Sequence, residues 1–162
     1  MSPSFTIERI RPEDDAAVAG IIRTVMPEFG ACGAGFAIHD AEVDAMHATY
    51  TSPRSAYFVV LDGDHVMGGA GIAPLSGADR SVCELRKMYF LPELRGLGFG
   101  QALIDLCLDQ ARRLAFRRCY LETLESMQRA RSLYLKNGFE KLCGPLGRTG
   151  HFSCDSYYAR DL

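Results

Sequence analysis

The fold is decided by one stretch of the chain, Met88-Tyr89-Phe90-Leu91-Pro92-Glu93-Leu94-Arg95-Gly96-Leu97-Gly98-Phe99-Gly100-Gln101. Three alternating glycines lie in it, between the expected end of a strand and the expected start of a helix. Glycine lets consecutive backbone N–H groups turn toward one point, and a helix N-terminus adds positive potential there. The stretch therefore predicts a cradle for phosphate groups.

Two familiar phosphate cradles do not fit this stretch. A P-loop has Lys followed by Ser or Thr after its last glycine, whereas Gln101-Ala102 follows Gly100 here. The dinucleotide fingerprint needs a glycine in place of Gln101, and an acidic residue at the end of the next strand of a parallel sheet. The glycine spacing alone also leaves open a tight helix entry that binds nothing.

The residues after the stretch predict a β-α-β unit. Apolar residues recur at helical spacing over 101–115, and the β-rich segment 119–123 follows. A strand at 82–90 ahead of this helix would then lie parallel to the strand at 119–123. A further helix is expected at 127–137, where Gly138 provides the usual C-terminal cap.

The rest of the chain predicts a mostly antiparallel sheet with two more helices. Asp62-Gly63-Asp64 is a hairpin signal between two strands. We expect, in order, a strand at 5–10, a helix at 15–26, a helix that Asp40 caps and that carries Val43, Met46, His47 and Tyr50, strands at 56–61 and 65–74, and one or two strands within 139–162.

Bulk properties exclude several classes of protein. The chain has 162 residues, which predicts one domain over 1–162. Its 18 basic and 20 acidic residues nearly balance, so we expect neither nucleic acid nor membrane as a partner. The N-terminus lacks a secretory signal, and the six cysteines lack the spacing of a disulfide scaffold. We expect a cytoplasmic protein whose cysteines are reduced and mostly buried.

Two motifs carry a resemblance to a known family. Arg95-x-x-Gly98-x-Gly100, with Pro92 before it, resembles the acetyl-CoA signature of the GNAT superfamily of N-acetyltransferases. The segment from Ala130 to Phe139 is similar to the family's A-x-x-L-Y-x-x-x-G-F segment, one strand after the cradle. The close match covers 82–139. It implies an α+β fold layered α/β/α, with a mixed, mostly antiparallel sheet that splays open at a central parallel strand pair.

The resemblance implies acetyl-CoA as co-substrate and no metal. Backbone groups of Met88 and Phe90 would pair with the pantetheine arm, and the N–H groups from Gly96 to Gln101 would hold the pyrophosphate. The expected cofactor-binding residues are Met88, Tyr89, Phe90, Arg95, Gly96, Leu97, Gly98, Phe99, Gly100, Gln101 and Tyr134. One position departs from the family: Met127 replaces an Asn that touches the arm in many members, so Ser126 or Gln128 substitutes for it or the contact is lost.

Amine acetylation needs a neutral amine, a polarised thioester carbonyl and a proton for the departing thiolate. Glu84 matches the position of the general-base glutamate in histone-modifying members, although it could instead pair with Arg86. Glu122, at the end of the next parallel strand, is a second candidate for a catalytic or substrate-binding role, as a base acting through water. Tyr134 matches the family tyrosine that protonates the thiolate, and it could also be a packing residue. A backbone N–H at a strand bulge near Phe90 would meet the oxyanion.

The motifs say less about the residues that bind the acceptor substrate. His151 and Cys154 have a metal-like spacing, but a structural zinc site needs about four ligands and no second pair stands nearby. We expect no metal, and expect these two residues to pack or to line the acceptor pocket. Phe36, His39 and Asp40 lie where the family builds its acceptor wall.

The resemblance therefore implies transfer of an acetyl group from acetyl-CoA to a primary amine of a small molecule or amino acid. Two alternatives stay open: a protein or peptide acetyltransferase that acts on lysine or an N-terminus, and a CoA-binding sensor without turnover. The motifs name neither the acceptor nor its pathway. They also leave the oligomeric state open, and a homodimer is compatible with the resemblance.

Overall fold

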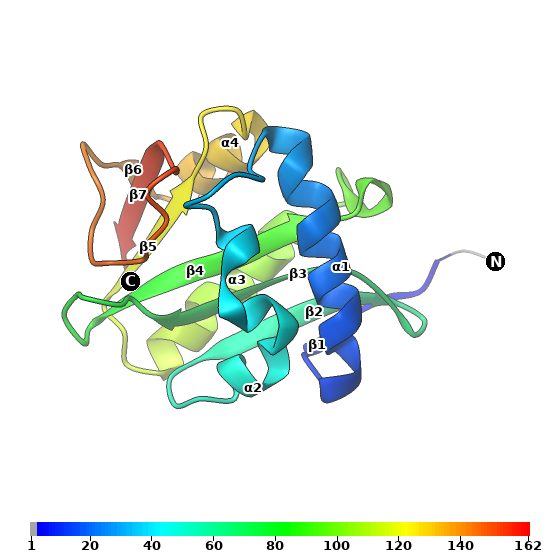
Figure 1. Ribbon diagram of the computed structural model, residues 1–162. Coiled ribbons are helices and arrows are strands. Elements are labelled where there is room, and N and C mark those ends of the chain that lie inside the picture. The colour runs from blue at the N-terminus through cyan, green and yellow to red at the C-terminus, as the bar shows by residue number, and fades with distance from the viewer. Residues whose placement is uncertain (1–2) are drawn as a thin grey trace.

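The computed structural model describes residues 3–162, which form one seven-stranded sheet with helices packed against it (Figure 1). Its strands are β1 (Phe5–Arg9), β2 (Ala56–Asp62), β3 (His65–Pro74), β4 (Val82–Phe90), β5 (Arg118–Thr123), β6 (Glu140–Lys141) and β7 (Ser156–Asp161). Their spatial order is β1-β2-β3-β4-β5-β7-β6, and β4–β5 is the one parallel pair of this sheet. The predicted mixed, mostly antiparallel α+β fold is confirmed.

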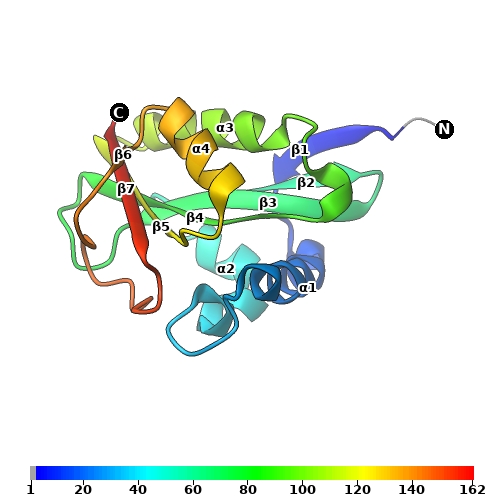
Figure 2. The same ribbon diagram turned by 90° about the horizontal axis from the view of Figure 1, so that it is seen from above.

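Helices cover both faces of the sheet, as expected. Helices α1 (Asp15–Val25) and α2 (Met46–Tyr50) lie on one face, and α3 (Phe99–Arg113) and α4 (Gln128–Lys136) lie on the other (Figure 2). Helix α3 turns one apolar stripe to the core because its buried residues recur at intervals of one, three or four. These residues are Leu103, Ile104, Cys107, Leu108 and Ala111. The predictions for α1, α3 and α4 were correct within two residues at each end.

The prediction of one continuous helix from Asp40 was wrong. The structure has a 3-10 turn at Ala41–Asp44 and then α2, with Ala45 between them at a φ of −143°. Asp40 makes no capping hydrogen bond, because its carboxylate is bound by Lys87 on β4 instead. Because of this tertiary contact, Asp40 does not cap a helix, and the segment forms a short 3-10 turn followed by a separate helix.

The parallel strands β4 and β5 separate after three residue pairs. Val82, Cys83 and Glu84 pair with Arg118, Cys119 and Tyr120, and no further pair between these two strands follows. Strand β5 continues to pair with β7 as far as Thr123. Beyond Glu84, the side of β4 that faces β5 therefore offers unpaired backbone N–H and C=O groups to a cleft. The predicted splay is confirmed.

Strand β4 also carries a bulge, a few residues before the predicted position near Phe90. The register with β3 shifts between Gly69 and Gly71, and Lys87 on the opposite strand has a φ of 49°. The buried Tyr57 hydroxyl donates a 2.7 Å hydrogen bond to the Lys87 carbonyl. This bond fixes the direction of the bulged peptide.

Two expectations from composition can be compared with the structure. All six cysteines are free, but only Cys83, Cys107 and Cys119 are fully buried, while Cys32 and Cys143 are exposed. The expectation of mostly buried thiols was therefore wrong for those two, which lie on irregular segments. Within residues 3–162, no helix combines the length and the apolar character needed to cross a membrane.

Candidate active site between the splayed strands

A cavity of about 680 Å³ occupies the cleft between β4, β5 and the start of α3. We call it the larger cavity. Nine of the predicted cofactor-binding residues line it: Met88, Tyr89, Phe90, Arg95, Gly96, Gly98, Gly100, Gln101 and Tyr134. Leu97 and Phe99 do not, because the Leu97 side chain is 56% exposed and the Phe99 ring packs against Phe5 with centroids 5.2 Å apart.

The glycine loop before α3 has the backbone geometry of an anion cradle. Gly96 and Gly98 adopt φ values of 76° and 88°, in the left-handed region that side chains disfavour. Helix α3 begins at Phe99, so the N–H groups of its first turn have no partner within the helix. Gly100 has a different role: a Cβ there would lie 2.9 Å from Leu133 of α4, so glycine allows the two helices to approach.

The Arg95 side chain, expected to bind the cofactor, makes its hydrogen bonds to other residues of the protein. Its Nε and Nη2 donate to the Phe90 carbonyl at 3.1 and 2.9 Å, and its Nη1 pairs with Glu28 at 2.9 Å. The side chain therefore ties the glycine loop to the end of β4 and to the segment after α1. Arg129 and Lys136 of α4 also line the larger cavity and add positive charge there. The motifs did not indicate these two.

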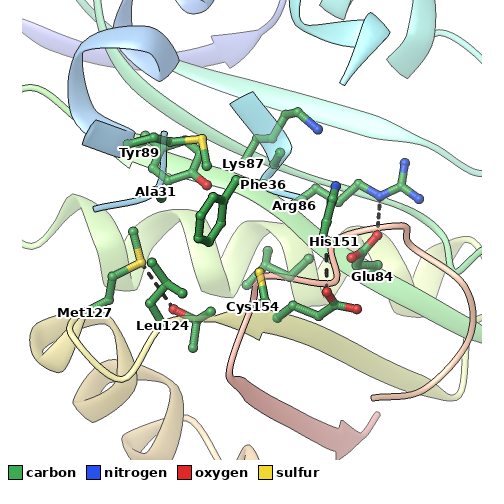
Figure 3. A pocket seen from close by; sticks show the side chains of 15 residues that line it. Ala31, Phe36, Glu84, Arg86, Lys87, Tyr89, Leu124, Met127, His151 and Cys154 are labelled. Atoms are coloured by element: carbon green, nitrogen blue, oxygen red, sulfur yellow. Dashed lines mark hydrogen bonds and ion pairs between the residues drawn. The ribbon is translucent and has the colours of Figure 1, made fainter. Parts of the chain in front are cut away.

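A second, smaller cavity of about 50 Å³ adjoins the larger one and shares several of its lining residues (Figure 3). We call it the smaller cavity. Its lining comes from the α1–α2 connection, from β4 and β5, and from the loop before β7. The residues that line both cavities are Leu85, Lys87, Tyr89, Glu122, Thr123 and Met127. We call these six residues the shared wall of the two cavities.

Glu122 lies in the shared wall with one carboxylate oxygen left free. Its side chain is only 3% exposed. Oε1 accepts hydrogen bonds from the Tyr120 hydroxyl at 2.9 Å and the Thr149 hydroxyl at 2.8 Å. Oε2 is buried and has no hydrogen-bond partner within residues 3–162. A buried polar atom without a partner is costly, which marks Oε2 as a point that a ligand can satisfy.

Glu84, the other predicted base, forms an ion pair with the neighbouring Arg86. Its Oε1 accepts a hydrogen bond from Arg86 Nε at 2.5 Å, the pairing that the sequence left open as its alternative. Burial raises the pKa of Glu84, and the Arg86 charge opposes that rise. Glu84 lines the smaller cavity but does not line the larger one.

His151 lines the smaller cavity between two carboxylates. Its Nε2 lies 2.9 and 3.0 Å from the two oxygens of Asp40, and its Nδ1 lies 3.9 Å from Glu122 Oε2. Desolvation lowers the pKa of His151, but the hydrogen bond to Asp40 and the Asp40 charge outweigh it, so the pKa is raised overall. Burial acts to raise the pKa of Asp40, yet hydrogen bonds and charge from His151 and Lys87 lower it.

The remaining acceptor-wall candidates divide into two groups. Phe36 and Cys154 line the smaller cavity, and burial raises the pKa of the Cys154 thiol to about 12. His39 does not: it is exposed, with Nε2 at 3.0 Å from the Cys32 carbonyl. Within residues 3–162, no group of three or more His, Cys, Asp or Glu side chains is arranged to hold a metal.

Tyr134 has features of both roles that the sequence left open. Its ring packs against Phe139 and Tyr158, with centroids 5.9 and 6.3 Å away. It also lines the larger cavity. Burial raises the pKa of its hydroxyl, so this group stays protonated at neutral pH.

Met127, at the position that departs from the family, is part of the shared wall. Its sulfur accepts a 3.3 Å hydrogen bond from the Thr123 hydroxyl. Ser126 lines the larger cavity, but its hydroxyl donates to the Phe29 carbonyl at 3.2 Å. Gln128 also lines this cavity.

Comparison with known sequences gives a consistent family. Residues 16–139 match the acetyltransferase (GNAT) family. The chain is 41% identical over 160 residues to YjgM of Escherichia coli (strain K12), an uncharacterized N-acetyltransferase, and the match covers 98% of this chain and 96% of that protein.

Solved structures of acetyltransferases share the fold. A GNAT-family acetyltransferase from Staphylococcus aureus MU50 superposes with a TM-score of 0.78 at 17% identity, covering 98% of this chain and 99% of that one. The phosphinothricin acetyltransferase of Sinorhizobium meliloti, solved in complex with acetyl-CoA, gives a TM-score of 0.76 at 24% identity, covering 98% of this chain and 88% of that one. At these identities the likeness shows the fold.

Proposed function

The chain belongs to the GNAT family and is an acetyl-CoA-dependent acetyltransferase, and from this premise we propose that its acceptor is the primary amine of a small molecule. The observation that carries the proposal is the shared wall. Glu122 lines both cavities and keeps a buried, unpartnered carboxylate oxygen there. A carboxylate in that position suits an amine that must meet a thioester from the opposite side.

Three features support the larger cavity as the acetyl-CoA site. Its volume of about 680 Å³ lies within the range of pockets that hold cofactors. The left-handed backbone at Gly96 and Gly98 turns N–H groups ahead of α3, which suits a pyrophosphate. The unpaired side of β4 beyond Glu84 can bind an amide-bearing arm as an added strand.

The loops around the smaller cavity favour a small acceptor over a peptide. Ser153 of the loop before β7 donates its hydroxyl to the Ala34 carbonyl at 2.6 Å. A Cβ on Gly35 would lie 2.6 Å from the Phe152 ring, so these two loops are in direct contact. A peptide would have to separate them to cross the site, whereas a small amine fits beneath them.

We assign Glu122 to contact with the acceptor amine, and Tyr134 to donation of a proton to the leaving thiolate. When bound, acetyl-CoA supplies a thioester with a carbonyl carbon open to attack. Tyr134 lines the larger cavity and holds its proton at neutral pH, as an acid for a thiolate must. Glu84 is assigned a structural part, since Arg86 binds it and the larger cavity does not reach it.

The bulge of β4 supplies a donor for the thioester oxygen. The Lys87 carbonyl accepts the Tyr57 hydroxyl, and the Met88 N–H belongs to the same trans peptide, so it points the opposite way. Met88 lines the larger cavity. We assign its N–H to the oxyanion, a contact that strengthens as negative charge develops.

The test is a thiol-release assay with acetyl-CoA and a panel of small amines, amino acids and lysine peptides. We expect turnover with small amines, and a fall in kcat/KM of about 10²-fold or more for Glu122→Gln, because this variant lacks the charge that binds the acceptor amine. Acetyl-CoA affinity, measured by titration calorimetry, should be unchanged in this variant. Faster turnover of every lysine peptide than of every small amine would favour the peptide alternative, and no turnover at all would favour the sensor.

A further inference from the structure

The smaller cavity is surrounded by more negative than positive charge. Arg86 pairs with Glu84 at 2.5 Å and with Glu42 at 3.7 Å. Lys87 pairs with Asp40 at 2.7 Å and also with Glu42. With Glu122, four carboxylates thus face two permanent cations, which leaves two excess negative charges when His151 is neutral and one when it is protonated.

Neither permanent cation is free to bind a negatively charged substrate. The Lys87 side chain is buried, and both of its partners are carboxylates. The Arg86 guanidinium binds Glu84 and also donates to the Pro74 carbonyl at 3.1 Å. Among the fully buried side-chain polar atoms of the wall, Glu122 Oε2 has no hydrogen-bond partner within residues 3–162. The electrostatics of the cavity therefore favour a cation and oppose a carboxylate.

The His151 ring is oriented so that its Nδ1 faces Glu122 Oε2. Asp40 binds Nε2 through both carboxylate oxygens, at 2.9 and 3.0 Å. In the neutral ring, this contact assigns the N–H to Nε2 and leaves the lone pair on Nδ1. Nδ1 lies 3.9 Å from Glu122 Oε2, which is wider than a hydrogen bond.

We propose that the smaller cavity binds its acceptor as an ammonium ion against Glu122 Oε2, and that His151 Nδ1, oriented by Asp40, accepts the ammonium proton. This inference rests on the proposed amine acetyltransferase function and names its substrate class: short primary alkylamines without a carboxylate next to the nitrogen. His151 is then a catalytic residue that touches the substrate, and Asp40 is a positioning residue.

The proton balance follows from these contacts. The ammonium gives one proton to His151 Nδ1, and the imidazolium is held between Asp40 and Glu122. The amine nitrogen bonds to the acetyl carbonyl carbon, the carbon–sulfur bond breaks, and sulfur keeps the electron pair. Tyr134 gives its proton to that sulfur and recovers one from the acylated nitrogen. The net products are the amide, the free thiol and one proton that His151 releases to solvent.

An imidazole suits this step better than a carboxylate. An alkylammonium has a pKa near that of lysine, about 10.4, and ordinary His at about 6.5 is closer to it than ordinary Glu at about 4.3. Asp40 raises the pKa of His151 further toward that of the amine. The charged groups that face the imidazole are Asp40 from the α1–α2 connection, Glu84 and Lys87 from β4, and Glu122 from β5; Lys87 opposes the rise.

The rest of the cavity limits the size and the polarity of the carbon chain of the amine. Its apolar walls come from Met26, Ala31, Phe36, Leu124 and Met127. A volume of about 50 Å³ corresponds to roughly three to five water-sized groups. A short aliphatic chain fits such a space without leaving a polar atom unsatisfied.

The first test of this inference compares amino acids with the amines that differ only in having hydrogen in place of the carboxylate. The pairs are alanine with ethylamine, valine with isobutylamine, and leucine with isopentylamine. We expect kcat/KM for at least one amine to exceed that of its amino acid by about 10²-fold or more, because a carboxylate would face excess negative charge. If every amino acid matches or exceeds its amine, the inference is wrong while the acetyltransferase function stands.

The second test follows kcat/KM of the best amine against pH. The wild-type protein should lose activity at low pH as His151 becomes protonated. His151→Asn should lower kcat and remove this acidic limb, and Asp40→Asn should shift the limb to lower pH because it removes the contact that raises the pKa. Glu122→Gln should raise KM for the amine and keep the limb.

His39→Gln is the matched control, because His39 is an exposed imidazole that does not line the smaller cavity, with its Nε2 at 3.0 Å from the Cys32 carbonyl. It should leave the profile unchanged. Acetyl-CoA affinity, measured by calorimetry, shows that each variant is folded. An acidic limb that persists in His151→Asn, or that disappears in Glu122→Gln, overturns the assignment of the base. Absence of turnover with every amine overturns the inference together with the proposed function.

Discussion

At the scale of single residues, the site depends on which polar atoms are already satisfied. Glu84 and Glu122 lie on adjacent parallel strands, and the sequence offered Glu84 as the first candidate base and Glu122 as the second. In the structure, Arg86 binds Glu84, whereas one oxygen of Glu122 has no partner within residues 3–162. The two carboxylates therefore differ in what they can offer a ligand.

Tyr134→Phe tests the proposed acid. The substitution removes only the hydroxyl and keeps the ring that packs against Phe139 and Tyr158. We expect kcat to fall by about 10²-fold, the usual worth of a general acid, with little change in thermal stability. Because burial raises the pKa of Tyr134, the wild-type rate should show no loss from this group on going from neutral to mildly alkaline pH. Unchanged kcat in the variant would assign Tyr134 to packing alone.

Motifs identified some of these residues and missed others. Tyr134 and the glycines have fixed spacing along the chain, so the sequence could predict them. The contact between Asp40 and His151 joins residues 111 positions apart, and it depends on where two irregular loops meet. Neither loop has a hydrophobic period that would position it, so the pair could be expected only in general terms, as part of an acceptor wall.

At the scale of elements, the loop that opens α3 can be tested with a matched glycine. Gly98 and Gly63 both have left-handed φ values, 88° and 58°, and open space around the Cβ position. Gly98→Ala and Gly63→Ala should each lower the free energy of unfolding by about 1 kcal/mol. Only Gly98→Ala should weaken acetyl-CoA binding, by about tenfold, or 1.4 kcal/mol, in titration calorimetry. Equal effects of both variants on binding would show that the loop backbone has no special part in it.

The contact between the two loops over the smaller cavity has a similar pair of variants. Gly35 and Gly30 have nearly equal φ values, 81° and 78°, but a Cβ on Gly35 would meet the Phe152 ring and one on Gly30 would meet nothing. We expect Gly35→Ala to raise KM for the amine by about tenfold through misplaced packing. Gly30→Ala should leave KM within about twofold of the wild-type value. A similar rise of KM in both variants would show that the contact between the two loops does not affect amine binding.

Regular elements were predicted well where a period or a turn signal was strong. The hairpin at Asp62-Gly63-Asp64 and the apolar stripe of α3 depend on local residues, so their bounds followed from the sequence. The region after Asp40 failed because Lys87, on a distant strand, binds the carboxylate that would cap the helix. The bulge in β4 was displaced for a similar reason, since the Tyr57 hydroxyl holds the Lys87 carbonyl.

At the scale of the whole molecule, Asp40 and His151 link the two loops across the site, so the link should stabilise the fold in a defined pH range. The raised pKa of His151 contributes stability below about pH 6.5, its unfolded value, which is lost as pH rises through the folded pKa. The lowered pKa of Asp40 contributes stability above about pH 3.9, which is lost as pH falls through the folded pKa. The link is therefore strongest between these two values.

Urea unfolding of the wild-type protein and of His151→Asn can measure this contribution. We expect the variant to be less stable by about 1 kcal/mol near pH 5.5, and the difference to shrink toward pH 9, as the imidazole loses its proton. His39→Gln again serves as the control, because its exposed ring should contribute little at either pH. A stability difference that does not change with pH would assign His151 a packing role only.

Donor and acceptor are proposed to meet directly at the wall shared by the two cavities, without an acetylated protein intermediate. Cys154 lines the smaller cavity, and acetylation of its thiol would be the competing route. Burial raises the pKa of that thiol to about 12, which makes it a poor nucleophile at neutral pH. The most direct test is a set of initial rates with acetyl-CoA and the amine both varied. Intersecting double-reciprocal lines are predicted, while parallel lines, with acetylated protein seen by mass spectrometry in the absence of amine, would contradict direct transfer.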